Sequence, residues 1–117
     1  MAFVASANAP RAIEFYRDTL GLKFIADEPY AAVFDANGTM LRIQKVESLT
    51  PAGHTALGWR VKDIAETVRG LVAKGVAFER YGFLPQDDLG IWTAPGGAKV
   101  AWFKDPDGNT LSLTQWE

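Results

Sequence analysis

Cysteine is absent from the 117 residues, and histidine occurs only once, at His54. Without cysteine the chain can form no disulfide, no thiolate nucleophile and no thiolate metal site. A single histidine with no nucleophile-elbow motif also speaks against a Ser-His-acid hydrolase. Disulfide scaffolds, cysteine-based sites and serine-hydrolase triads are therefore excluded.

The chain also lacks a strong net charge and a long apolar run. Its net charge at pH 7 is −2, so no basic field attracts phosphate backbones, and nucleic acid is not an expected partner. No apolar run reaches the length of a membrane span, and no charged and apolar leader precedes the first expected strand. We expect a cytoplasmic protein without membrane contact, and the 48% hydrophobic content suffices for one domain with a real core.

The first half of the chain has the pattern of a strand, a helix and three further strands. Asn8 or Ala9 caps the helix, and the early Pro10 costs it no needed hydrogen bond. The helix is expected to run to about Leu20, because Gly21 is placed to end it. The expected strands are Ala2–Ala7, Leu22–Ala26, Ala31–Asp35 and Met40–Lys45, and Asn37-Gly38 is the hairpin turn before the last of them.

A second round of the same elements follows a polar connection. Asp63 and Glu66 have the spacing of a capping box, in which Asp63 accepts from the first turn and Glu66 reaches back. The expected strands are Ala56–Val61 before this helix and, after it, segments near Ala77–Phe83, Gly90–Thr93, Lys99–Phe103 and Thr110–Gln115. The pattern predicts a single domain over 1–117, with module 1 at about 1–45, a linker at about 46–54 and module 2 at about 55–117.

A tight turn joins the last two expected strands. Pro106 sets its φ for the turn, Asp107 can bond its own backbone, and Gly108 accepts a left-handed conformation. An aromatic strand precedes the turn, and the strand after it alternates leucine with serine and threonine. This predicts a hairpin with one apolar face and one polar face.

The two halves form an internal repeat of strand, helix and three strands, which predicts two similar modules. The aromatic strand followed by Asp105–Asn109 resembles the end of a module in the vicinal oxygen chelate superfamily, which includes glyoxalase I, extradiol dioxygenases and bleomycin-resistance proteins. Arg11–Leu22 is similar to the first helix of that family. The resemblance implies an α+β fold of two tandem βαβββ modules, whose sheets form a curved, incomplete barrel with a cleft.

The resemblance also implies a metal centre with ligands from the first and last strands of each module. These positions fall on Met1, Arg42, Ala56 and Ser112, and none of them is a carboxylate or an imidazole. Arg42 would even place a permanent positive charge where a divalent cation should lie. His54 remains as a metal-binding candidate, although one histidine without a carboxylate partner cannot complete a catalytic zinc or non-haem iron site.

Aromatic and cationic side chains dominate the predicted cleft. Strand alternation places Ala56, Gly58 and Arg60 toward the cleft and Leu57, Trp59 and Val61 toward the helix, and it adds Met40, Arg42 and Gln44 from the first module. Two interpretations stay open: the tryptophans are core and the arginines solvated, or they build an aromatic-walled pocket for an anionic or amide-bearing molecule. The candidate ligand-binding residues are His54, Arg42, Arg60, Ser112, Trp92, and Trp102 or its neighbour Phe103.

Two functions of different classes follow. The first is a small-molecule binding protein of the bleomycin-resistance type that needs no cofactor or metal. The second is a metal-dependent glyoxalase-type lyase or extradiol-type dioxygenase, with zinc, nickel, iron or manganese held in part by His54.

We also predict a homodimer. Two modules in one chain would leave open sheet edges, which natural proteins cover. Trp116 lies next to the C-terminus, where a bulky apolar ring suits an interface.

Overall fold

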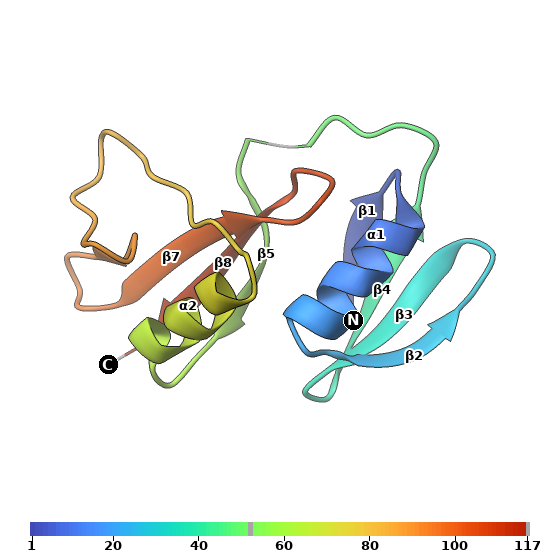
Figure 1. Cartoon of the computed structure of the whole chain (residues 1–117), viewed down its shortest axis with the longest axis horizontal. Helices are drawn as coiled ribbons and strands as arrows, with labels where there is room; N and C mark the ends of the chain where they lie inside the picture. Colours follow the sequence, from blue (N-terminus) through green and yellow to red (C-terminus); the bar gives the residue numbers. More distant parts are fainter. Residues whose placement is uncertain (52, 117) are drawn as a thin grey trace. The chain divides into compact units, whose positions relative to one another are not determined.

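The computed structural model describes residues 1–51 and 53–116 and falls into two compact units. Unit 1 comprises Met1–Gly53 and Asp105–Asn109, and unit 2 comprises His54–Lys104 and Thr110–Glu117. Each unit holds one four-stranded sheet and one α-helix (Figure 1). The predicted α+β class with two tandem modules is therefore confirmed. No described helix has the length and apolar character of a membrane span.

Unit 1 has the strand order β1-β4-β3-β2, with β1 parallel to β4 and the other pairs antiparallel. A π-helical turn, η1, continues directly from the α-helix. The elements are β1 (Ala2–Ser6), α1 (Ala9–Glu14), η1 (Phe15–Thr19), β2 (Lys23–Asp27), β3 (Ala31–Ala36) and β4 (Thr39–Lys45).

Local signals in unit 1 act as the sequence predicts. The Asn8 side chain accepts from the backbone N–H of Arg11, so Asn8 is the helix cap. Asn37 and Gly38 both have positive φ values, 52° and 96°, as a tight hairpin turn requires. Side chains of the helical segment pack on the sheet, where the rings of Tyr16 and Phe34 lie 6.0 Å apart. The apolar core of this unit includes Val4, Ala12, Tyr16, Ala32, Phe34, Leu41 and Ile43, and the polar residues Ser6, Asp105 and Asn109 are buried beside it.

Unit 2 repeats the plan with the strand order β5-β8-β7-β6. Its elements are β5 (Thr55–Arg60), α2 (Ile64–Ala73), β6 (Trp92–Thr93), β7 (Lys99–Lys104) and β8 (Thr110–Gln115). The Asp63 carboxylate accepts from the Glu66 N–H, as predicted, but no return bond from the Glu66 side chain forms among the described contacts. The Gln115 side chain instead accepts from the Ile64 N–H at 2.9 Å, so a second helix donor is satisfied from β8.

The predicted strand at Ala77–Phe83 is wrong, and the strand predicted at Gly90–Thr93 is shorter than expected. The first segment makes only an isolated bridge, Phe78 to Phe103. The Gln86 side chain takes up the backbone N–H of Tyr81 and the backbone C=O of Glu79 and of Gly90. Because the Gln86 side chain satisfies these backbone groups, the segment at Ala77–Phe83 needs no partner strand. In the segment at Gly90–Thr93, regular pairing with β7 is confined to Trp92–Thr93.

The predicted tight turn between β7 and β8 is confirmed, with φ of 87° at Gly108. The carboxylate that bonds the turn backbone is that of Asp105, which accepts from the N–H groups of Asp107 and Asn109. The prediction that Asp107 plays this part is wrong, because its carboxylate accepts from the Ser6 hydroxyl and the Ala7 N–H. These contacts explain why the five turn residues belong to unit 1 while both flanking strands belong to unit 2.

Candidate functional site

One face of the unit 2 sheet gathers most of the predicted ligand-binding residues. Trp102 lies opposite Ser112 on β8, which in turn lies opposite Gly58 on β5. The next row runs from Trp92 through Val100 and Thr114 to Arg60. Since alternate residues of a strand share a face, the two rows form one surface, which we call the tryptophan face. It consists of Gly58, Arg60, Trp92, Val100, Trp102, Ser112 and Thr114.

The opposite face of the same sheet is the packed one. Phe103 is fully buried there, so Trp102 and not Phe103 belongs to the tryptophan face. Leu57 and Trp59 lie beside the buried Leu111 and Leu113, which confirms their predicted side of the sheet. Helix α2 supplies the matching apolar side chains Ile64, Val68 and Leu71. The tryptophan face is thus the side of the sheet that the helix of this unit leaves open.

The aromatic rings on this face form a continuous chain of contacts. The rings of Trp92 and Trp102 are stacked, with centroids 6.0 Å apart and an interplanar angle of 30°. The ring centroid of Tyr81 lies 5.4 Å from that of Trp102, in a T-shaped arrangement, and 5.8 Å from that of Phe83. Both tryptophans are half-buried, and Phe83 is 81% exposed. Such rings offer flat apolar surface at low conformational cost, which suits stacking on a planar ligand.

The polar groups of the tryptophan face are free to bind. Ser112 is buried next to Gly58, and a Cβ at position 58 would lie 2.6 Å from its hydroxyl oxygen. Glycine therefore leaves room for this hydroxyl in its present position, and the hydroxyl makes no hydrogen bond within residues 1–51 and 53–116. The Arg60 side chain is exposed and forms no ion pair with any described residue. A cation and a hydroxyl acceptor or donor thus flank the aromatic surface.

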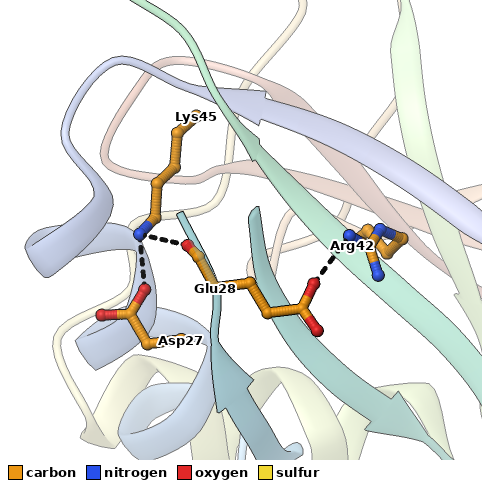
Figure 2. Close-up of polar contacts among 4 residues, drawn as sticks. All are labelled: Asp27, Glu28, Arg42 and Lys45. Carbon is orange, nitrogen blue, oxygen red and sulfur yellow. Dashed lines mark hydrogen bonds and ion pairs between the residues drawn. The ribbon is translucent and has the colours of Figure 1, made fainter. Parts of the chain in front are cut away.

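Arg42 lies in unit 1, on the face of β4 that it shares with Met40 and Gln44, as predicted. Its guanidinium Nη2 donates to Glu28 Oε1 at 2.9 Å (Figure 2). Arg42 therefore has a counter-ion, which the sequence did not indicate, because Glu28 belongs to the turn between β2 and β3. That Arg42 and Arg60 line one cleft stays a prediction.

The residues at the family's metal positions do not fit a metal. Arg42 is cationic and paired, and the other positions offer a thioether, a methyl group and a hydroxyl. His54 is exposed and precedes β5, and the irregular register between Thr55 and Leu57 makes Ala56 the extra residue of a bulge. That Ala56 shares a face with Gly58 stays a prediction, because strict alternation does not hold across a bulge. Within the described residues, no group of three or more His, Asp or Glu side chains could hold a metal ion.

A buried polar cluster in unit 1 was not predicted. The Tyr16 hydroxyl donates to Asp105 Oδ2 at 2.8 Å, and the Asn109 side chain donates to the same oxygen at 2.9 Å. Burial, together with the nearby Asp105 charge, raises the pKa of Tyr16 far above its ordinary value. The phenol therefore stays protonated and acts as a hydrogen-bond donor that holds the turn. The tyrosine in the helix and the acidic turn are both visible in the sequence, but not their contact.

A hollow of about 390 Å³ opens beside the start of α2 in unit 2. Two of the helix donors there are already used, since the Ile64 N–H donates to the Gln115 side chain and the Glu66 N–H donates to the Asp63 carboxylate. Its lining includes two lysines and two aspartates, Lys62, Lys99, Asp63 and Asp87. This hollow therefore lacks the stacked aromatic rings of the tryptophan face.

Known proteins share this architecture throughout. The profile of the Glyoxalase/Bleomycin resistance protein/Dioxygenase superfamily matches residues 2–113. The chain is a member of that superfamily. The resemblance drawn from the first helix and the acidic turn is thereby confirmed. No protein of curated function matches the sequence.

Three solved structures of this superfamily's fold illustrate the likeness. A superfamily member from Sphaerobacter thermophilus is 25% identical, with a TM-score of 0.77 over 98% of this chain and 94% of that one. The bleomycin resistance determinant encoded on the transposon Tn5 is 22% identical, with a TM-score of 0.78 over 99% and 95%. Lactoylglutathione lyase from Agrobacterium tumefaciens is 19% identical, with a TM-score of 0.73 over 98% and 92%. At these identities the last two show the shared fold alone.

Proposed function

We propose that this superfamily member binds a small planar molecule on the tryptophan face, without a metal and without making or breaking a bond. The stacked Trp92–Trp102 pair beside the unpaired Arg60 and the free Ser112 hydroxyl is the observation that supports this most. Stacking would give affinity, and the guanidinium would select a carboxylate or an amide oxygen. Arg42 is a further proposed ligand contact from unit 1.

Binding without a metal is favoured over the lyase or dioxygenase alternative by the side chains at the metal positions. A metal site lacking its direct ligands cannot be restored by the residues around it. The bleomycin resistance determinant with the same fold supports the binding class only through its name and its fold. His54 stays a candidate contact, since it is exposed just before β5.

A thermal-shift screen with small acids, thiol conjugates and aromatic antibiotics should identify a ligand, because binding to the native state raises the unfolding midpoint. Replacing Trp92 by alanine should then weaken that ligand by about 1–3 kcal/mol, as for a buried aromatic anchor. Trp59→Phe is the matched control, since Trp59 lies on the packed face of the same sheet. Unchanged affinity in Trp92→Ala with a large loss of stability would show that Trp92 is core and refute the site.

The charge preference can be tested at Arg60. Arg60→Met should cost more affinity for an acid than for the corresponding amide, because only the acid carries the charge that the guanidinium pairs with. The two affinities are measured by titration of tryptophan fluorescence. Equal losses for both ligands would remove the anion preference and leave stacking alone.

We also propose that the chain forms a homodimer. The Trp116 side chain is 57% exposed in the single chain, and β1, β2, β5 and β6 are the outer strands of their sheets within the described residues. Light scattering at micromolar concentration should give about twice the chain mass of 12.8 kDa. Trp116→Ser should shift the protein toward monomer, whereas a monomer over the whole concentration range would refute the dimer. The cytoplasmic location stays a prediction.

A further inference from the structure

The ion pair between Arg42 and Glu28 in unit 1 has a geometry in which another carboxylate can replace Glu28. Arg42 lies in the middle of the sheet, between Phe3 on β1 and Val33 on β3. Its side chain is 28% exposed and that of Glu28 is 47% exposed, so the Arg42 side chain is the more restricted of the two by surrounding residues. One nitrogen of the guanidinium meets one oxygen of the carboxylate, and Arg42 donates to no other described residue. Most of the donor fork is therefore unused.

The turn that carries Glu28 is held independently of this pair. Lys45 Nζ donates to the Asp27 carboxylate and to the backbone C=O of Glu28 (Figure 2). The backbone N–H of Lys45 also donates to the C=O of Tyr30, and the N–H of Glu28 donates to the C=O of Ala31. The backbone of the turn is therefore fixed from both sides. Glu28 can release Arg42 by rotating its own side chain, and the turn need not move.

The pair is also weak enough to be displaced. Exposed ion pairs contribute little, because water and salt screen them and two long side chains must be ordered. A ligand carboxylate that meets the guanidinium with two parallel hydrogen bonds gains more than the single bond of Glu28. Glu28, however, is tethered next to Arg42 and competes at a high effective concentration. A ligand must therefore be anionic and planar to replace it.

We propose that Glu28 is a tethered counter-ion that occupies Arg42 until a ligand carboxylate displaces it, so that Glu28 sets the selectivity of Arg42 for carboxylates. This rests on the proposed ligand-binding function, in which Arg42 is a ligand contact. A neutral ligand leaves the pair in place and gains nothing from Arg42. Glu28 thus prevents ligands that would make only a weak or single hydrogen bond from binding to Arg42, although Glu28 does not contact the ligand itself.

The test uses benzoate as the anionic probe and benzamide as its neutral counterpart. Both are titrated into the ¹⁵N-labelled full chain, and the Nε–H resonance of Arg42 reports binding. Glu28→Gln should tighten benzoate binding about twofold to fivefold, which corresponds to the range for an exposed ion pair. Benzamide binding should not change.

Asp27→Asn is the matched control, because it removes one negative charge from the residue next to Glu28, at the end of β2, but leaves the partner of Arg42 in place. Benzoate affinity in this variant should equal that of the unaltered chain. An equal gain in Asp27→Asn and Glu28→Gln would show a general charge effect and overturn the proposal. So would the absence of any benzoate-induced shift at Arg42 in Glu28→Gln.

A second pair of variants separates this proposal from the proposed function. Adding Arg42→Met to Glu28→Gln should abolish the gain in benzoate affinity, and any gain that persists overturns the role of Arg42. If Glu28→Gln tightens benzoate binding but Trp92→Ala has no effect on ligand affinity, the proposed role of Glu28 is supported and the proposed binding site on the tryptophan face is refuted. If Trp92→Ala weakens ligand binding but Glu28→Gln leaves benzoate affinity unchanged, the site on the tryptophan face is supported and the proposed role of Glu28 is refuted.

Discussion

Replacing Tyr16 by phenylalanine removes one hydroxyl from the buried cluster that holds the Asp105–Asn109 turn. The phenol donates to Asp105 Oδ2 at 2.8 Å, and the ring itself is fully buried. Hydrogen bonds to charged groups contribute about 1.5–3 kcal/mol. Because Asn109 still donates to the same oxygen in the variant, the carboxylate is not left unpaired. We therefore expect a loss near the lower end, about 1.5 kcal/mol, in the free energy of unfolding near pH 8.

The pH dependence of this loss gives the sharper test. Burial and the Asp105 charge raise the pKa of Tyr16 in the folded chain, whereas the unfolded phenol ionises at about pH 10. Below that pH both states are protonated, and the contribution of Tyr16 is fully present. Above it the unfolded state releases a proton that the folded state retains, so stability falls by about 1.4 kcal/mol per pH unit. Phenylalanine has no such proton, and the gap between the two proteins should shrink by about 1.4 kcal/mol by pH 11.

The assay is urea unfolding of both proteins, followed by tryptophan fluorescence from pH 8 to pH 11. Other groups that ionise in this range, including Tyr81 with its own raised pKa, are present in both proteins and cancel in the difference. A difference that stays constant up to pH 11 would refute the reasoning. It would mean that Tyr16 ionises equally in both states, or that the variant loses only packing.

Three further predictions follow from single contacts. Gly58→Ala should lower the free energy of unfolding by about 1–3 kcal/mol, because its Cβ would lie 2.6 Å from the Ser112 hydroxyl oxygen. Adding Ser112→Ala should restore most of this stability in thermal unfolding, and no recovery would contradict the clash. Asp63→Ala should lower the free energy of unfolding by about 1 kcal/mol, because the cap of α2 is lost, whereas Asp63→Asn should lower it little. Equal losses of stability for the two variants in urea unfolding would mean that the charge of Asp63 matters more than its cap. Elemental analysis of the purified protein should find no stoichiometric metal; one equivalent whose removal by chelator abolishes an activity would favour the lyase or dioxygenase alternative.

Local patterns predicted most of the secondary structure because the forces that form it act over a few residues. Asn8 and Asp63 cap helices through their own side chains, and Asn37-Gly38 turns the chain through its own backbone preferences. Strand alternation likewise placed Trp59 on the packed face and Arg60 on the open one. The error at Ala77–Phe83 arose where a side chain from outside the segment, Gln86, took the backbone hydrogen bonds.

The sequence by itself determined the superfamily, the two modules and the residue types available to a ligand, since each of these depends on short-range pattern or motif. Only the tertiary structure decided which of those residues meet. Pairing of β8 with β7 on one side and β5 on the other brought Trp102, Ser112 and Gly58 into one row, although Gly58 is far from the other two in the chain. The counter-ion of Arg42 and the partner of Tyr16 were likewise decided by long-range contacts. No local preference encodes such contacts, because their partners lie on different elements and are brought together only by tertiary packing.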